Sequence, residues 1–313
     1  MIPVTPALTV RPLAEEEMDA ARAFVNETLS IAPFTVPLDK AEVQAQWVRE
    51  QPPTHYEMRW QRHQRLGAWR AGEMVGFLDA ATGHDSDHFD APEHPPHGIV
   101  RFLALTPREP LADEAYRLLM DAADDFWRLQ GARELYAYPI GGGYRTFQAG
   151  AGILPGDWDT TVRRLTAHDW RFCRRYYALL RPSGAPVEEE YPAANLSLVQ
   201  QRLAEGRAYR AYHRRVELVA SAKLVGMNLD RTNTAARLAH IIDIHVDEDW
   251  RNRNVGKWLV RRLLNDAALQ GYQEVLAFLP NTLPNAMALF MQQGFVEINY
   301  RGYTLERALG ALE

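Results

Sequence analysis

The stretch His240-Ile-Ile-Asp-Ile-His-Val-Asp-Glu-Asp-Trp-Arg-Asn-Arg-Asn-Val-Gly-Lys257 decides the fold of this chain. Its apolar start, residues 241–246, has the character of a strand and gives way to a short acidic turn. A polar segment follows at residues 251–256, and an amphipathic helix is expected over residues 257–270. The order of strand, polar loop and helix predicts a β-α unit whose loop carries several cations.

The start of the predicted helix is expected to bind anions. The first N–H groups of a helix have no partner within it and carry a partial positive charge, so phosphates bind there. Arg251, Arg253 and Lys257 flank this junction and can add charge-assisted contacts to a diphosphate. Gly256 lets a ligand approach the backbone, and Asn254 is of the residue type that best tolerates a left-handed conformation after glycine.

This segment resembles the acyl-CoA-binding motif of the GNAT N-acetyltransferase superfamily. In that family the fourth strand ends in a valine, and Gln/Arg-x-x-Gly-x-Gly/Ala begins five residues later. Val246, Arg251 and Gly256 keep the spacing, whereas Asn254 stands where the first glycine is usual. Residues 285–295 resemble the family's closing helix, A-x-x-x-Tyr-x-x-x-Gly-Phe, with Phe290 in place of the tyrosine.

The chain also contains an internal repeat, which bears on its architecture. Residues 99–115 align with residues 240–256 at an offset of 141, and in both halves a helix, a glycine and a strand ending in proline follow. With the resemblance, this repeat implies an α/β (α+β) fold of two tandem GNAT-like domains. Each is expected to be a mixed, mostly antiparallel splayed sheet flanked by helices.

A linker rich in Pro, Gly and charge, residues 182–192, separates the two halves. We expect a degenerate GNAT-like domain at residues 1–184 and an acetyltransferase domain with the acyl-CoA site at residues 185–313, a layout similar to that of mycothiol synthase. Residues 193–204 are expected to be helical. The second half then lacks an obvious opening strand, so strands are expected to be exchanged at the domain boundary.

The first repeat has lost the residues of the anion site. The three motif positions of the second repeat are occupied in the first by Pro110, Asp113 and Ala115. Proline has no N–H to donate, and Asp113 is expected to cap its helix and to fill the anion site with its own carboxylate. The first domain is therefore expected to be non-catalytic and to serve as a scaffold or a substrate-binding wall.

Composition limits the partners of the chain. A net charge of −5 over 313 residues argues against nucleic-acid binding, which requires clustered Lys and Arg. The N-terminus lacks the layout of a signal peptide, and no apolar stretch reaches membrane-spanning length, so we expect a cytoplasmic protein without a membrane partner. Cys173 is the single cysteine and is expected to be a buried, inert thiol.

A polar loop at residues 83–97 holds several possible metal ligands. Their spacing matches no known ligand motif, so we expect a solvated loop and no metal. A metal-binding role of this loop is an alternative that a metal assay would test. The residues are His84, Asp85, Asp87, His88, Asp90, Glu93, His94 and His97.

The resemblance implies that acetyl-CoA is the acyl donor co-substrate. It also implies that the strand ending at Val246 splays from the strand at residues 274–279, and that free backbone groups in this gap pair with pantetheine. The loop and helix start would hold the pyrophosphate, and the following helix would reach the CoA chain. The implied cofactor-binding residues are Val246, Asp247, Glu248, Arg251, Asn252, Arg253, Asn254, Val255, Gly256, Lys257, Asn281, Asn285 and Phe290.

Direct transfer of an acyl group to an amine needs a base for the ammonium proton and an acid for the thiolate. His240 occupies the family's frequent base position, and an unperturbed imidazole titrates near ~6.5. The alternative is a strand-start histidine bonded to a backbone carbonyl. The Val246 amide would polarise the thioester carbonyl. Because Phe290 cannot donate a proton, the candidate acids are Tyr300 and Tyr303; the other reading of each is an aromatic that packs in the core or the final hairpin.

Strand parity bears on which side chains accompany His240. On a regular strand Asp243 and His245 face the side opposite to His240. A β-bulge, which is common at active sites, would undo that parity.

Two functions follow from these expectations. The first is an acyl-CoA-dependent N-acyltransferase that transfers an acetyl group to a primary amine, with a catalytic C-terminal domain and an amine entering between the domains. The acidic balance favours a small or cationic amine. The alternative is a CoA-binding regulatory or interaction protein without turnover, suggested by Asn254 and Phe290. A monomer and a homodimer both agree with the sequence.

Overall fold

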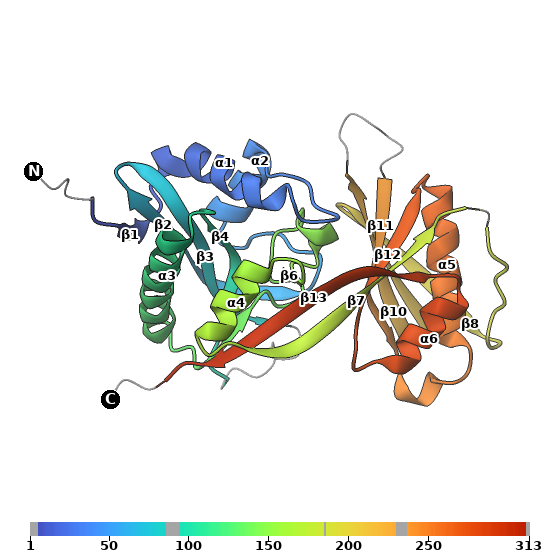
Figure 1. The fold of residues 1–313 in the computed structure, drawn as a ribbon. Helices are drawn as coiled ribbons and strands as arrows, with labels where there is room; N and C mark the ends of the chain where they lie inside the picture. Colours follow the sequence, from blue (N-terminus) through green and yellow to red (C-terminus); the bar gives the residue numbers. More distant parts are fainter. Residues whose placement is uncertain (1–5, 86–93, 185, 230–236, 311–313) are drawn as a thin grey trace, which may run out of the picture. The chain divides into compact units, whose positions relative to one another are not determined.

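The computed structural model describes residues 6–85, 94–184, 186–229 and 237–310. Its contacts divide the chain into two compact units (Figure 1). The first comprises Met1–Arg174 with Tyr303–Glu313, and the second comprises Arg175–Gly302. Among the described residues, no helix is long and apolar enough to cross a membrane.

The first unit is built on the strand order β1-β2-β3-β4-β5-β13. All neighbours with a described register are antiparallel except β4 and β5, which are parallel. Figure 1 shows α1 and α2 on one side of these strands and α3 on the other. The elements are β1 (Thr9–Pro12), α1 (Met18–Leu29), α2 (Lys40–Val43), β2 (Met58–Arg70), β3 (Glu73–Asp85), β4 (His97–Leu105), α3 (Glu109–Leu129), β5 (Glu134–Ala137), β6 (Leu154–Pro155) and α4 (Asp159–Ala167). Strand β7 (Arg171–Pro182) begins in this unit and lies mostly in the second.

The core of the first unit lies where helices press on the sheet. Helix α3 approaches β3 so closely that a Cβ atom at Gly76 would lie 2.9 Å from a methyl group of Leu119. Glycine is therefore the residue that allows this close packing. The buried face of α3 includes Ala115, Leu119 and Trp127, each 0% exposed.

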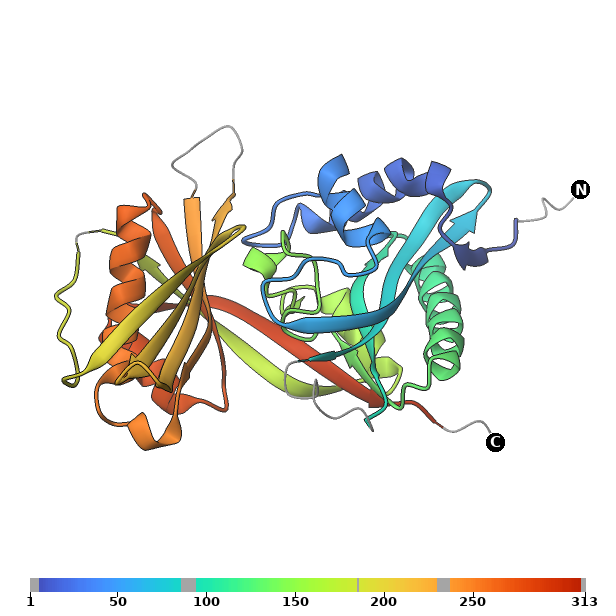
Figure 2. The ribbon, with the colours of Figure 1, turned by 180° about the vertical axis from the view of Figure 1, so that it is seen from behind.

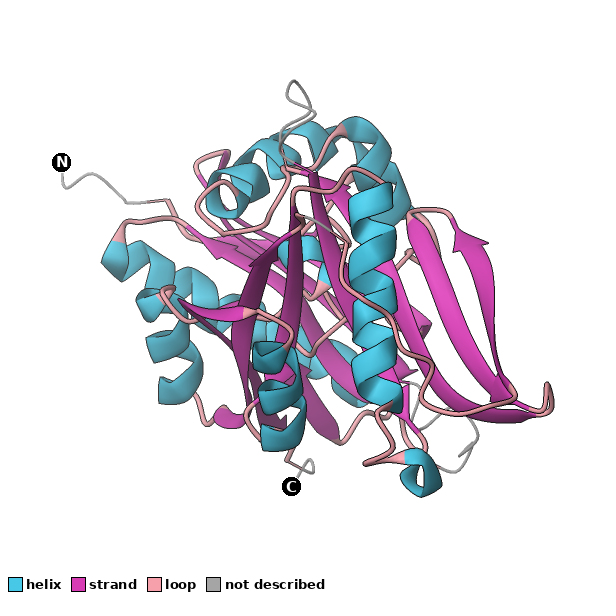
Figure 3. Ribbon diagram, turned by 90° about the vertical axis from the view of Figure 1, so that its right-hand side faces the viewer, coloured by secondary structure: helices cyan, strands magenta, loops and turns pink. Residues whose placement is uncertain are grey.

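The second unit has the strand order β7-β12-β11-β10-β9-β8. Strands β8, β9 and β10 form a meander, drawn in yellow and gold in Figure 2. Helices flank the strands (Figure 3). The elements are β8 (Leu196–Leu203), β9 (Gly206–His213), β10 (Glu217–Asn228), β11 (Arg237–Val246), α5 (Val255–Leu269), β12 (Glu274–Pro280), α6 (Pro284–Gln292) and β13 (Val296–Ala308).

The helix expected at residues 193–204 is wrong, because most of this segment is strand β8. Its Leu, Gln and Arg residues favour helix only weakly, and pairing with β9 from Leu196 to Leu203 decides its conformation. Strand β8 is thus the opening strand that the second half was expected to lack. Strand β9 follows it through a turn at Ala204 and Glu205, whereas helices α1 and α2 lie between β1 and β2 in the first unit.

The expected exchange of strands is confirmed. Strand β7, which precedes the linker, pairs with β12 of the second unit from Tyr176 to Pro182. In return, residues 305–308 of the last strand pair with β5 of the first unit. Each sheet is therefore completed by a strand that lies outside its own repeat.

In each unit the parallel pairing includes the repeat position of the first strand, but the partner residues are 140 residues apart, one less than the offset of the repeat. In the first unit Ile99 of β4 is opposite Tyr136 of β5, and in the second His240 of β11 is opposite Leu276 of β12. Ile99 and His240 are the two positions that the sequence repeat aligns.

Candidate functional site

The parallel strands of the second unit pair only along their first residues. Their described pairing ends at His240 and Leu276. Strand β11 continues to Val246 and β12 continues to Pro280. Beyond this point the facing backbone groups of the two strands do not hydrogen-bond to each other in a ladder. This is the geometry of a splayed strand pair.

A β-bulge interrupts β11 within the same stretch. Ser221 of β10 is opposite His245, but Lys223 is opposite Ile242, so β11 carries one residue more than its partner. Asp243 has a φ of 49° there, and its carboxylate accepts a hydrogen bond of 2.7 Å from Lys223. The bulge that would undo regular strand parity is therefore present.

The turn after β11 leads directly into helix α5. The side chain of Asp247 accepts a hydrogen bond of 3.0 Å from the Asp249 amide and starts a short 3-10 turn. Asn254 then takes a left-handed conformation with φ 61°, as its residue type predicted, and α5 begins at Val255. The first hydrogen bond of the helix runs from the Trp258 amide to the Asn254 carbonyl at 3.0 Å. The amides of residues 255–257 precede that bond and have no partner within the helix.

Gly256 brings this helix end onto the end of β11. A Cβ atom at Gly256 would lie 3.6 Å from a methyl group of Val246 and 3.2 Å from one of Leu289 in α6. A larger side chain would separate the helix end from the strand. The end of β11, the start of α5 and α6 thus meet at one glycine.

The predicted cations of the loop have different surroundings. Arg251 donates to the Val246 carbonyl at 3.2 Å and to the Glu248 carboxylate at 2.9 Å. Arg253 has its guanidinium 5.3 Å from the ring centre of Trp250. Lys257 lies in the first turn of α5 and is partly buried.

Trp250 is a site residue that the motif did not indicate. It is 7% exposed, and its indole N–H donates to Glu217 at 2.8 Å. His213 lies 3.1 Å from the other carboxylate oxygen of Glu217, and its ring packs against Trp250 at 4.9 Å. The hydrogen bonds from Trp250 and then His213 lower the pKa of Glu217 below its usual range. A tryptophan inside a polar, cationic motif was the available signal.

The structure separates the four predicted catalytic residues. His240 is 1% exposed and meets Phe278 edge-on at 5.4 Å, and Phe278 lies 6.2 Å from Tyr300. Val246 lies at the far end of the same strand as His240. Tyr303 belongs to the first unit, where it packs against Phe172 at 4.9 Å.

The remaining predicted cofactor residues divide by exposure. Asp247 is partly buried, and Asn252, Asn281 and Asn285 are exposed. The amide of Asn281 donates to the Arg175 carbonyl at 2.9 Å. Phe290 is fully buried and packs against Phe295 at 4.9 Å, so the structure gives it a place in the core.

The matching region of the first unit is occupied by the unit's own side chains. Pairing between β4 and β5 ends at Val100 and Ala137. The next residue, Tyr138, has φ 55° and is 0% exposed. Its hydroxyl accepts a hydrogen bond from the Leu103 amide at 3.0 Å and donates to the Leu103 carbonyl at 3.3 Å. Burial raises the pKa of this hydroxyl, which therefore stays protonated.

The expected capping role of Asp113 is wrong. Helix α3 begins earlier, at Glu109, because Pro110 suits the first turn of a helix. Asp113 lies one turn further on and accepts a hydrogen bond of 2.7 Å from Arg164. The carboxylate at the helix start is that of Glu109, which Arg164 contacts at 2.6 Å.

The predicted metal loop is described only in part, because Asp87, His88, Asp90 and Glu93 lie outside the described residues. Among the residues that are described, no group of three metal-ligating side chains comes together.

The thiol of Cys173 donates to the Thr304 carbonyl at 3.3 Å. Burial and then the charge of Glu306 raise its pKa to about 11, which fits an inert thiol.

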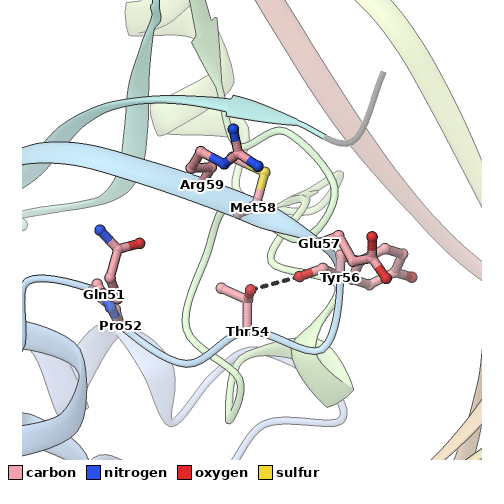
Figure 4. A pocket seen from close by; sticks show the side chains of 7 residues that line it. All are labelled: Gln51, Pro52, Thr54, Tyr56, Glu57, Met58 and Arg59. Atoms are coloured by element: carbon pink, nitrogen blue, oxygen red, sulfur yellow. Dashed lines mark hydrogen bonds between the residues drawn. The ribbon is translucent and has the colours of Figure 1, made fainter. Parts of the chain in front are cut away.

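A pocket of about 420 Å³ in the first unit contains none of the predicted residues (Figure 4). It lies between β2 and the segment before it, where the Thr54 hydroxyl donates to the Tyr56 carbonyl at 2.6 Å. The lining residues are Gln51, Pro52, Thr54, Tyr56, Glu57, Met58 and Arg59.

Comparison with known families agrees with this geometry. Residues 173–295 match the model of the acetyltransferase (GNAT) family. This segment contains the splayed strands, the bulge and the start of α5. The match identifies residues 173–295 as a GNAT acetyltransferase domain.

Solved GNAT structures are similar to the chain over nearly its whole length. A GCN5-related glucosamine N-acetyltransferase region of a fungal multi-domain GH3 β-N-acetylglucosaminidase has a TM-score of 0.72 and 13% identity, covering 97% of this chain and 38% of that one. A tandem GNAT protein from the clavulanic acid biosynthesis pathway has a TM-score of 0.67 and 16% identity, covering 98% and 100%.

A GCN5-related N-acetyltransferase from Sphaerobacter thermophilus has a TM-score of 0.60 and 11% identity, covering 98% of each chain. At these identities the likeness shows the fold, here the tandem GNAT arrangement. This chain spans less than half the length of the fungal protein. No curated protein matches it in sequence.

Proposed function

We propose that this chain transfers an acetyl group from acetyl-CoA to a primary amine by direct transfer, and that residues 185–313 form the catalytic domain. The observation that carries the proposal is the end of pairing at His240 and Leu276, next to a helix that begins at a left-handed Asn254. A splayed strand pair offers free backbone groups to pantetheine, and the helix start offers amides to a diphosphate. The family match supports acyl-CoA-dependent N-acyl transfer in general.

In this proposal the backbone near Val246 and Glu248 binds pantetheine, and the Val246 amide polarises the thioester carbonyl. The amides of residues 255–257 hold the pyrophosphate. Asn281, in the turn before α6, and Asn285, in the first turn of α6, are both exposed and contact the CoA chain. Phe290 supports this contact from within the core, because it is fully buried.

His240 is the proposed base and Tyr300 the proposed acid, because both lie beside Phe278 in the second unit. Burial of His240 requires that an acceptor or a water molecule reach the Phe278 side of β11 during turnover. Tyr303 is the alternative acid, although it packs within the first unit. The acceptor is proposed to be a small or cationic amine, given the net charge of −5.

We propose that residues 1–184 are non-catalytic, and the hydrogen bonds of Tyr138 support this division. In the first unit the tyrosine hydroxyl already occupies the amide and carbonyl of Leu103. The repeat aligns Tyr138 with Leu279, whose side chain has no hydrogen-bonding group. Pantetheine would have to displace a buried tyrosine in the first unit but not in the second.

Calorimetry with acetyl-CoA tests the cofactor part of the proposal. The wild type is expected to bind one molecule per chain, and a Gly256→Pro variant, which lacks one amide of the helix start, is expected to bind far more weakly. Release of free CoA thiol with a panel of amines then tests turnover, with His240→Ala as the control. A wild type that binds no acetyl-CoA would refute the proposal.

The second candidate is a CoA-binding protein without turnover. Full burial of Phe290, at the position where the family usually has a tyrosine acid, favours it. Stoichiometric acetyl-CoA binding with no thiol release across the amine panel would support this function over the first.

A further inference from the structure

The two arginines of the loop between β11 and α5, Arg251 and Arg253, differ in their hydrogen-bonding partners. Arg251, the motif residue, is held by two partners, the Val246 carbonyl at 3.2 Å and the Glu248 carboxylate at 2.9 Å. Both partners belong to the turn that leads out of β11. These contacts use its Nε and one Nη group and place a carboxylate against the guanidinium, which lowers the gain from a new contact with a phosphate.

Arg253 is differently placed. Its guanidinium lies over the ring of Trp250 at 5.3 Å, and its side chain is exposed. Among the described residues, no carboxylate lies within ion-pair distance of it. A guanidinium on an aromatic face keeps its N–H groups available while its freedom of movement is reduced. Arg253 is thus a partly preorganised cation with free donors.

The ring that carries Arg253 is itself fixed. Trp250 is 7% exposed, its indole N–H is bound to one carboxylate oxygen of Glu217, and His213 binds the other oxygen. Both oxygens of Glu217 are therefore engaged, and among the described residues no ion pair joins this carboxylate to Arg253. The anchor comes from the ends of β9 and β10, outside the acyl-CoA motif.

We propose that Arg253, positioned by Trp250, is the side chain that contacts a phosphate group of acyl-CoA, and that Arg251 braces the turn instead. The inference rests on the proposed acyl-CoA site. It assigns cofactor affinity to a motif position that the family leaves variable, and to an anchor formed by Trp250, Glu217 and His213.

Binding of acetyl-CoA to matched single variants tests the assignment. Arg253→Ala is expected to raise Kd by about tenfold, which is the size of one lost charge-assisted hydrogen bond. Arg251→Ala is expected to change Kd by less than about twofold and to lower Tm, since it loosens the turn. Trp250→Leu combined with Arg253→Ala is expected to bind no more weakly than Trp250→Leu alone, because the two act as one unit.

Two further ligands show which phosphate group of CoA Arg253 contacts. Acetyl-dephospho-CoA lacks the 3′-phosphate, so equal binding of this ligand by wild type and Arg253→Ala would assign the contact to that phosphate. A persisting difference would assign it to the diphosphate; either result supports the proposal. Acetyl-pantetheine carries no phosphate group. If Arg253→Ala weakened the binding of this ligand as much as that of acetyl-CoA, the variant would be generally damaged and the proposal would be overturned.

The opposite ranking, with affinity lost in Arg251→Ala and kept in Arg253→Ala, would also overturn the assignment while leaving the acyl-CoA site intact. A wild type that binds neither acetyl-CoA nor its analogues would instead refute the proposed function, and the inference with it.

Discussion

The hydroxyl of Tyr138 satisfies both backbone groups of Leu103, across the point where β4 and β5 stop pairing. One side chain thereby makes the hydrogen bonds that a neighbouring strand would otherwise make. In the first unit β4 and β5 still separate, but the gap between them is filled by the unit's own tyrosine side chain.

Tyr138→Phe is expected to destabilise the protein by about 1–3 kcal/mol, because it leaves a buried amide and carbonyl without a partner. Denaturant unfolding followed by circular dichroism measures the change. Tyr191→Phe is the control, since Tyr191 is 64% exposed. Equal stability of the two variants would show that the Leu103 groups do not depend on the hydroxyl.

Gly256→Pro is expected to weaken acetyl-CoA binding by more than about tenfold, because proline removes an amide from the proposed diphosphate site. Proline fits the first turn of a helix, so α5 should persist. Gly256→Ala keeps the amide and requires only a small shift of Leu289, 3.2 Å from the new Cβ atom. Calorimetry on both variants separates loss of the N–H from crowding, and similar affinities would contradict the role of this amide.

Asn254→Gly is expected to keep or raise stability, whereas Asn254→Val is expected to lower it by roughly 1–2 kcal/mol. The reason is the left-handed backbone of Asn254, with φ 61°, which glycine adopts freely and a β-branched residue resists. Thermal unfolding of the two variants checks the difference. A valine variant as stable as wild type would mean that the turn can adopt another conformation.

His63 is expected to make the protein sensitive to acid. Burial, followed by the charges of Arg101 and Arg65, lowers the pKa of His63 to about 2. In the unfolded chain the same residue takes up a proton near pH ~6.5, so protonation favours unfolding. Its contribution to stability is complete above that pH and decreases as the pH falls toward the folded value.

Urea unfolding at about pH 7.5 and about pH 5 measures this slope. His63→Gln should lose less stability than wild type over that interval. His168→Gln, at an exposed histidine, serves as the control. A slope unchanged by His63→Gln would assign the acid sensitivity to other groups.

Local chemistry made much of the second unit predictable. The strand ending at Val246, the left-handed Asn254 and the helix after it follow from residue types at short range. The repeat aligned Ile99 with His240, and both residues take part in the parallel strand pairing of their units. These features depend on neighbours within a few residues or on an offset that the sequence itself displays.

Long-range partners decided the features that could not be predicted. Residues 196–203 are a strand because β9 pairs with them, and Asp113 binds Arg164 rather than the helix start. Trp250 could be read from the motif, but its anchor, Glu217, lies on another strand. No local pattern specifies which distant group a buried side chain meets.

The exchanged strands also determine when the sheet of the first unit can be completed during synthesis. The Thr304 hydroxyl donates to the Tyr138 carbonyl at 2.9 Å, across 166 residues of chain. A contact so distant in sequence carries a large loop-closure cost and slows folding. During synthesis, β5 leaves the ribosome long before its partner at residues 305–308 exists. The half that is translated first must therefore keep an open sheet edge until residues 305–308 have been synthesised.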